Sequence, residues 1–127
     1  MEKLTQREER IMRLLWQLKE AVVKDLINEF PDPKPPYTTV SSIIRILESK
    51  GYVGHKAYGK THVYHPLISQ DEFRKHSFGR LLKDYFGGSY HQVVSFMVEE
   101  EGLEGSEIEQ IKAIIEEAER KEGSDHE

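Results

Sequence analysis

A helix that runs directly into a β-hairpin is the sequence feature that most limits the possible folds of this chain. Apolar residues recur at helical spacing over residues 38–50, and Gly51 follows where a left-handed residue closes a helix. Two runs rich in Tyr, Val, Thr and His come next, at 52–58 and 61–67. Gly59–Lys60 lies between them, and glycine in that position favours a type II′ turn. The sequence therefore predicts a helix joined to a two-stranded hairpin.

Two shorter helices are predicted before this helix. Thr5 and Glu8 form a capping box that begins a helix at Thr5, and its apolar pattern ends near residues 19–20. A second apolar pattern covers residues 23–30. The segment 31–36 has prolines at four of its six positions and cannot continue a helix. Three short helices followed by a hairpin are typical of a winged helix-turn-helix domain, which we assign to residues 1–70.

The C-terminal half is predicted to be helical except at its end. Apolar spacing, capping boxes and glycine breaks predict helices over residues 69–86, 89–100 and 106–118. The capping box of the last helix would consist of Ser106 and Glu109. We expect residues 122–127 to be disordered. The expected fold class is therefore mainly α with a small β-hairpin.

The composition of the chain limits its cellular context. Its 127 residues include no cysteine, which excludes disulfides and thiolate metal sites. No apolar run approaches the roughly 20 residues that cross a bilayer, and the N-terminus lacks the apolar core of a signal peptide. These features predict a cytoplasmic protein without membrane insertion.

The net charge of −5 conceals an uneven distribution along the chain. Residues 1–70 carry 11 Lys and Arg against 8 Asp and Glu, a net of +3, whereas residues 71–127 carry 7 against 15, a net of −8. A basic segment suits contact with a polyanion. Together with the predicted domain type, this distribution indicates that residues 1–70 bind double-stranded DNA.

The outer face of the predicted third helix carries short hydroxyl side chains instead of the Glu and Lys of an ordinary solvated face. At 100° per residue, the side opposite the apolar stripe holds Thr38, Ser41, Ser42, Arg45 and Ser49. Short side chains let a helix backbone enter the major groove, and hydroxyl groups both donate and accept hydrogen bonds. We therefore expect DNA contacts from this face and from the adjoining Thr39. The alternative for Thr38 and Thr39 is that their hydroxyls only cap the helix.

The hairpin is expected to act as the wing and to contact the DNA backbone through Lys56, Lys60 and His62. The alternative for the two lysines is ordinary solvation. His62 and His65, with His55 across the hairpin, raise the question of a metal site. Neighbouring strand residues alternate faces, so His62 and His65 point in opposite directions and we expect no metal. We also find no catalytic constellation, and therefore expect neither enzymatic activity nor a cofactor.

The C-terminal helices carry more apolar surface than helices this short can cover alone, which is typical of a subunit interface. The expected dimerisation residues are Phe78, Leu82, Tyr85, Phe86, Val94, Met97, Ile108, Ile111 and Ile115. We therefore assign residues 71–121 to a helical dimerisation region, because paired subunits can read two DNA half-sites. The alternative is that this half folds back onto the first three helices.

Three stretches resemble one family, the penicillinase and methicillin-resistance repressors (BlaI/MecI type) with their copper-responsive CopY-type relatives. "LTQREERIMRLLW" is similar to the first helix of that family, including Glu9, Met12 and Trp16. "YTTVSSIIRILESKGYVGHKAYGKTHVYHPLIS" is similar to its recognition helix and wing, and "GGSYHQVVSFMVEEEGLEGSEIEQIKAII" to its dimerisation region. The resemblance covers nearly the whole chain and implies a homodimeric repressor bound to an inverted-repeat operator.

The resemblance also implies a partner for part of the family. In the antibiotic-responsive members a membrane sensor-protease signals, and the repressor is cut within the fifth helix at a bond that is typically Asn-Phe. The matching stretch here reads Val94–Ser95–Phe96–Met97, which places the corresponding bond at Phe96–Met97 or Ser95–Phe96 and lacks the asparagine. The copper-responsive members carry a C-terminal cysteine cluster, which this chain lacks. Two alternatives stay open, a winged-helix protein-interaction module and a regulator that senses a small ligand.

Overall fold

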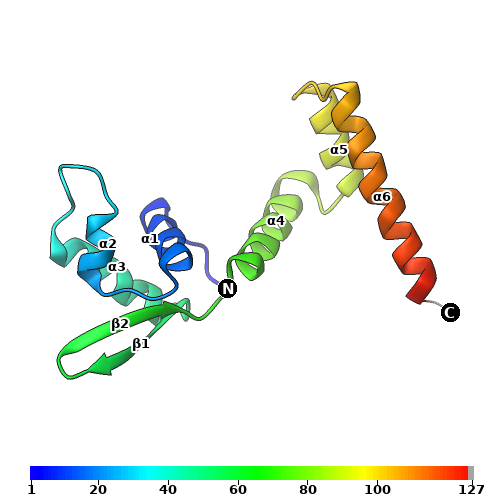
Figure 1. Ribbon diagram of the computed structural model, residues 1–127. Coiled ribbons are helices and arrows are strands. Elements are labelled where there is room, and N and C mark those ends of the chain that lie inside the picture. The colour runs from blue at the N-terminus through cyan, green and yellow to red at the C-terminus, as the bar shows by residue number, and fades with distance from the viewer. Residues whose placement is uncertain (126–127) are drawn as a thin grey trace. The chain divides into compact units, whose positions relative to one another are not determined.

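The computed structural model describes residues 1–125, with side chains through residue 122. Figure 1 shows its elements in chain order, from α1 in blue to α6 in red. The described residues form six helices and one two-stranded sheet, which confirms the predicted mainly α fold class with a small hairpin. The chain divides into two compact units, Met1–Phe78 and the part from Gly79 onward. Within residues 1–125, no helix is both long enough and apolar enough to cross a membrane.

The first unit is a winged helix-turn-helix, in which three helices surround one core and a hairpin follows the third helix in the chain. Its helices are α1 (Gln6–Leu18), α2 (Val23–Asn28) and α3 (Tyr37–Ser49). The fully buried core residues come from all three helices and from the start of the hairpin, and they include Ile11, Met12, Leu15, Leu26, Val40, Ile44, Leu47, Tyr52 and Val53. The apolar side predicted for the third helix is therefore the side that faces the core.

Helix α1 begins at the predicted capping box. The Thr5 hydroxyl accepts from the Glu8 amide at 3.2 Å, and the Glu8 carboxylate accepts from the Thr5 amide at 3.2 Å. Each of these contacts satisfies an amide at the helix start, where the helix itself offers no partner.

The start of α3 differs from the prediction. Pro36 occupies the N-cap position, and its carbonyl accepts from the amides of Thr39 and Val40 at 3.1 and 3.3 Å. No side-chain hydrogen bond caps this helix. The alternative that Thr38 or Thr39 caps the helix is therefore wrong, because the helix already includes both residues.

The end of α3 confirms the predicted role of Gly51. This glycine has a φ of +83°, and its amide donates to the Glu48 carbonyl at 3.1 Å. The Tyr52 amide donates to the Leu47 carbonyl at 3.0 Å. This pair of bonds is the Schellman motif, which turns the chain sharply from the helix into the hairpin.

Strands β1 (Val53–Tyr58) and β2 (Thr61–Pro66) form the predicted antiparallel hairpin. Gly59 has a φ of +63°, the sign that a type II′ turn requires at its first central position. An isolated bridge joins Ala21 to Tyr64 of β2 through backbone hydrogen bonds of 2.8 and 2.9 Å. This bridge ties the wing to the segment between α1 and α2. The sequence analysis does not predict it, because one residue has no periodicity.

Helices α4 (Gln70–Phe86), α5 (Tyr90–Glu99) and α6 (Gly105–Asp125) make up the C-terminal half. The Ser69 hydroxyl accepts from the Glu72 amide at 3.1 Å, as predicted for the start of α4. Helix α6 already begins at Gly105, so Ser106 is not its cap and the predicted capping box of Ser106 and Glu109 is wrong. Residues 122–125 are helical where the sequence analysis expects disorder. Residues 126–127 of that expected tail lie outside the described residues.

Candidate nucleic-acid interface

The outer face of α3 presents most of the predicted hydroxyl residues to solvent. Thr38, Ser42, Arg45 and Ser49 are exposed, and Ser41 is half-buried at the edge that faces the hairpin. Because no side chain caps α3, capping does not explain the hydroxyl of Thr38. These residues form a continuous strip of short polar side chains with one arginine.

Two residues of α3 depart from the predicted face. Thr39 is half-buried and lines a different groove, between α1 and the proline-rich segment 31–36. Ile46 is 47% exposed, although the sequence analysis does not single it out. Four residues at 100° each place Ile46 about 40° from Ser42, so a helical wheel is the signal that finds it. An exposed apolar side chain on a recognition helix can contact a thymine methyl group.

The hairpin divides the predicted wing residues between its two faces. In the β1–β2 register, Ala57 pairs with His62 and Lys56 with Val63, so Lys56 and His62 point to opposite sides. Lys60 in the turn and His62 in β2 face the groove next to α3, whereas Lys56 does not line it. Two of the three predicted wing residues, Lys60 and His62, therefore line the same groove as residues of α3.

The start of α2, the outer side of α3 and the hairpin enclose a groove of about 410 Å³. Four predicted DNA-contact residues line it, namely Ser41, Arg45, Lys60 and His62. Four other polar residues that were not predicted from the sequence also line it, namely Lys24, Tyr37, Thr61 and Tyr64. No local pattern marks these four residues, because they come together only when the elements pack. None of the residues that line this groove is acidic.

Tyr64 supplies a neutral hydroxyl group to the groove. Burial raises the pKa of its phenol above the ordinary value of 10.0, and the negative charge of Glu48 adds to this rise. Arg45 lowers the pKa but does not outweigh these effects. The phenol therefore keeps its proton at neutral pH and can donate a hydrogen bond.

The hairpin histidines do not converge on one point. His55 and His62 stack with their ring centroids 4.3 Å apart and an interplanar angle of 10°. His55 Nδ1 also bonds the Glu48 carboxylate on α3. His65 pairs with Gly54 in the register and lies on the other face of the hairpin. Across residues 1–125, no three His, Cys, Asp or Glu side chains are grouped as a metal site would require.

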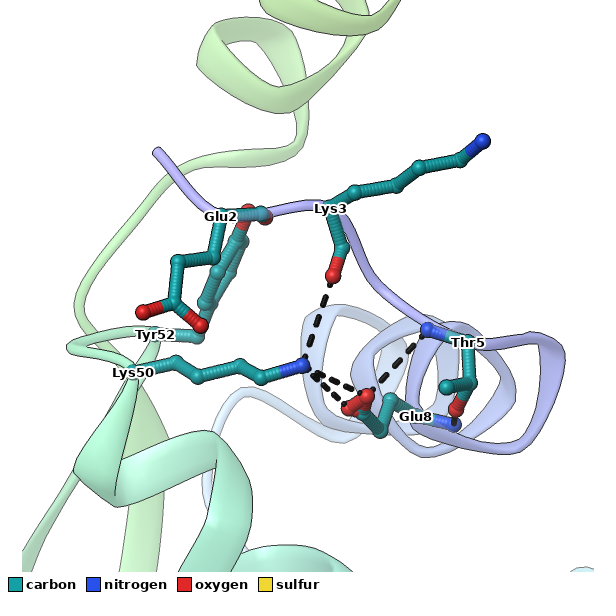
Figure 2. A network of polar contacts seen from close by, with 6 residues as sticks. All are labelled: Glu2, Lys3, Thr5, Glu8, Lys50 and Tyr52. Carbon is teal, nitrogen blue, oxygen red and sulfur yellow. Dashed lines mark hydrogen bonds and ion pairs between the residues drawn. The ribbon is translucent and has the colours of Figure 1, made fainter.

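An ion pair fastens the C-terminal end of α3 to the start of α1 (Figure 2). Lys50 Nζ donates to both carboxylate oxygens of Glu8, at 2.8 and 2.9 Å, and to the Lys3 carbonyl at 3.3 Å. The Tyr52 hydroxyl donates to the Glu2 carbonyl beside this pair. These contacts join the N-terminal segment, α1 and the end of α3, and so fix the direction in which the outer face of α3 points.

The Glu8 carboxylate is held in its charged form by these contacts. Burial raises the pKa of this carboxyl, but the hydrogen bond from Lys50, the bonds with Thr5 and the Lys50 charge together bring it below its ordinary value of 4.5. The Glu8 side chain is 5% exposed and the Lys50 side chain 19%, so solvent screens the pair only weakly.

Most of the predicted dimerisation residues lie on the surface of α4, α5 and α6. Phe78, Tyr85, Val94 and Ile115 are exposed, and Phe86, Met97, Ile108 and Ile111 are partly buried. Leu82 is buried, and its expected exposure in one protomer is wrong. The chain turns back after α4, where the Gly88 amide donates to the Leu82 carbonyl at 2.9 Å.

The residues of the possible cleavage bond lie inside α5. Phe96 is 44% exposed and packs edge-on against Phe86, with ring centroids 5.6 Å apart. Met97 is partly buried. A protease would therefore reach this bond only after part of α5 unwinds, since helical backbone does not fit an extended binding cleft.

A protein-family model, several characterised proteins and a solved structure match this chain. The family model described as Penicillinase repressor matches residues 4–117. The methicillin resistance regulatory protein MecI of Staphylococcus aureus (strain N315) is 24% identical over 106 residues, which cover 83% of this chain and 86% of that protein. The penicillinase repressor of Bacillus licheniformis is 26% identical over 112 residues, which cover 84% of each chain. Among solved structures, a possible transcriptional regulator for arsenical resistance aligns with a TM-score of 0.49 and 20% identity over 65% of this chain and 82% of that chain.

The family match includes both units of the structure. It begins at Leu4, just before α1, and ends at Glu117 within α6. The resemblance noted in the sequence is thereby confirmed. The chain belongs to the penicillinase repressor family, a family of transcriptional repressors.

Proposed function

We propose that this protein is a dimeric transcriptional repressor that binds an inverted-repeat operator through α3 and the hairpin wing. The observation that carries this proposal is the exposed strip of Thr38, Ser42, Arg45 and Ser49 on α3, beside a groove whose lining contains no acidic residue. The repressor function of the relatives supports it, because the family match covers the same helix and wing.

The strip has the properties that entry into DNA requires. The major groove of B-DNA is about 12 Å wide and admits a helix, provided that its side chains let the backbone approach. Ser and Thr hydroxyls can then donate to or accept from base edges, and an arginine can bond O6 and N7 of guanine together. Positive groups on the hairpin would bond phosphates next to the groove and orient the helix.

Dimerisation is proposed for the apolar surface of α4 to α6. Exposed large apolar side chains in this half include Leu81, Tyr85, Val94, Phe96, Val98, Ile114 and Ile115. Exposing this apolar surface to water is unfavourable in free energy, and a second copy of the chain would cover it. Two α3 helices in one dimer then bind two half-sites, and the operator would be an inverted repeat.

Release from DNA would follow from weakening the dimer, since one half-site alone binds far less tightly. If release is proteolytic, we propose that a membrane sensor-protease acts on the Phe96–Met97 or the Ser95–Phe96 bond in α5. Phe96 is exposed enough to be recognised, but the asparagine that typically precedes the family's scissile phenylalanine is absent here. Mass spectrometry of the protein isolated from induced cells would show this cleavage, and an intact chain in derepressed cells would refute it.

The proposal is tested by titrating the intact protein against the DNA upstream of its own gene and against a shuffled sequence of the same length. We expect preference for the upstream sequence, two protomers for each site, and binding that falls steeply with salt. Sedimentation of the free protein tests the dimer separately. Absence of DNA binding even at low salt would refute the repressor function and favour a protein-interaction module.

A further inference from the structure

The groove beside α3 is built from three elements that supply the same chemistry. Lys24 comes from α2, Arg45 from α3, and Lys60 from the hairpin turn, and all three side chains line it. The turn of Gly59 at φ +63° places Lys60 at the tip of the hairpin, where it lines the groove. Three cations around one concave surface favour an anion, because each adds to the same local potential.

Hydroxyl groups cover much of the remaining wall. Tyr37 and Ser41 come from α3, and Thr61 and Tyr64 from β2. Hydroxyl groups next to cations can complete the coordination of a phosphate, which has several acceptor oxygens.

The neighbouring carboxylate does not oppose an anion strongly. Glu48 is close enough to raise the pKa of Tyr64, but it does not line the groove and is bonded to His55. His62 stacks on His55 and also lines the groove. The Glu48 carboxylate is therefore already engaged by a side chain of the hairpin.

The residues that line the groove are also poorly suited to a small organic ligand. Binding sites for such ligands are lined mainly by apolar and aromatic side chains with a few polar groups. Here Val22, Val23 and the rings of Tyr37 and Tyr64 form the apolar and aromatic part. The rest of the lining is polar, it includes three cations, and none of it is acidic. The groove is thus better suited to a charged phosphate than to the ligand of a small-molecule sensor.

We propose that this groove is a binding site for one backbone phosphate of the operator DNA, held by Lys24, Lys60 and the hydroxyls of Tyr37 and Thr61, while Arg45 adds positive potential at its wall and is left to contact a base. The inference rests on the proposed repressor function and assigns DNA contacts to Lys24, Tyr37 and Thr61. A phosphate held between α2, α3 and the wing fixes the depth and register of α3 in the major groove. This contact adds affinity equally for every sequence.

Salt dependence gives the sharpest test. Each neutralised phosphate contributes about 0.9 to the slope of log affinity against log salt. A dimer has two copies of the groove, so Lys24→Ala should reduce the magnitude of the slope by about 2 and weaken preferred and shuffled DNA by the same factor. Lys75→Ala is the matched control, since Lys75 is an exposed lysine of the same unit that does not line the groove. Tyr37→Phe should weaken binding roughly five-fold for each half-site, about 25-fold for the dimer, without changing the slope, because it removes a hydroxyl group and no charge.

Operators with one methylphosphonate in place of a phosphate locate the contact. We expect one position in each half-site where this neutral linkage weakens wild-type binding but no longer weakens Lys24→Ala. If wild type and Lys24→Ala lose affinity equally at every position, or if Lys24→Ala and Lys75→Ala have the same slope, the groove holds no phosphate. Either result leaves the repressor function standing provided that the wild type still prefers its operator. Inorganic phosphate at constant ionic strength is a final arm. If it binds the wild type but not Lys24→Ala, and leaves the affinity of the wild type for DNA unchanged, the site belongs to a free anion instead.

Discussion

Removing the Lys50 ammonium should destabilise the winged-helix unit strongly, although Lys50 caps the end of α3 and is not one of the apolar core residues. In Lys50→Met the Glu8 carboxylate loses hydrogen bonds of 2.8 and 2.9 Å while it stays buried, with 5% of its side chain exposed. Breaking a buried ion pair on one side costs about 3–5 kcal/mol. Because the Lys50 side chain is itself 19% exposed, water can partly replace it, and we expect a loss of about 2–3 kcal/mol at neutral pH.

The dependence of this loss on pH identifies its electrostatic origin. The pKa of Glu8 in the folded protein is below 4.5, so its contribution is complete above that pH and is lost as the pH falls through the lower folded value. In Lys50→Met, burial acts without the opposing cation and favours protonated Glu8. The difference between wild type and variant should therefore shrink as the pH is lowered towards 4.

Urea unfolding followed by far-UV circular dichroism, at neutral pH and near pH 4, measures both effects. Arg13→Met is the matched control, because it breaks the Arg13–Glu9 pair at 3.0 Å whose side chains are 66% and 33% exposed. That exposed pair should contribute less than about 0.5 kcal/mol. A Lys50→Met loss as small as the control, or a loss of 2 kcal/mol or so that is the same at both pH values, would refute the reasoning.

Three further predictions follow from single positions. Arg45→Ala should weaken binding to the preferred DNA by about 1–3 kcal/mol and relax specificity at one base pair, which competition with single-base operator variants measures; a uniform loss would assign Arg45 to phosphate alone. Gly51→Ala should lower the free energy of unfolding by about 1 kcal/mol, because φ is +83° and the added Cβ, which meets no atom within 4 Å, gains no contact in return. Gly79→Ala in the middle of α4 should raise the free energy of unfolding by about 0.5–1 kcal/mol. Changes of the same sign in urea unfolding would contradict this pair of predictions. Trp16→Phe should cost about 1–2 kcal/mol in the same assay because it removes the 2.9 Å bond from Trp16 Nε1 to the Ile68 carbonyl, and an unchanged midpoint would show that this bond contributes little.

The parts of the fold that sequence reasoning predicted depend on contacts between near neighbours. The capping box of Thr5 and Glu8 spans three residues, and Gly51 and Gly59 each fix a turn through their own backbone angle. Apolar spacing in α3 likewise identified the buried side of the helix. Patterns of this kind are complete within one segment, so they can be read before the fold is known.

The parts that were missed depend on contacts between distant segments. Glu8 and Lys50 are 42 residues apart, and nothing near either residue predicts that they meet. Lys24 and Thr61 become neighbours of Arg45 only after α2 and the hairpin pack beside α3. The start of α3 was placed too late for a different reason, since a proline carbonyl caps it and the usual side-chain signal is absent.

The sequence therefore predicts which face of α3 is exposed, but not which residues of other elements lie beside that face. A helical wheel identifies Thr38, Ser42 and Arg45 as neighbours on one side of α3. The same wheel does not show that Thr39 lies in another groove or that Lys56 lies on the other face of the hairpin. Strand register and helix packing decide those two positions.

Photocrosslinking from a unique cysteine tests most directly whether the outer face of α3 enters DNA. The chain has no cysteine, so Ser42→Cys and Gln17→Cys each give one attachment point for a short photoreactive group, on α3 and on the exposed side of α1. We predict that the Ser42→Cys protein crosslinks to base-paired positions in both half-sites of its preferred DNA, and that the Gln17→Cys protein does not. Equal crosslinking from both positions, or none from Ser42→Cys while the protein remains bound, would contradict the account.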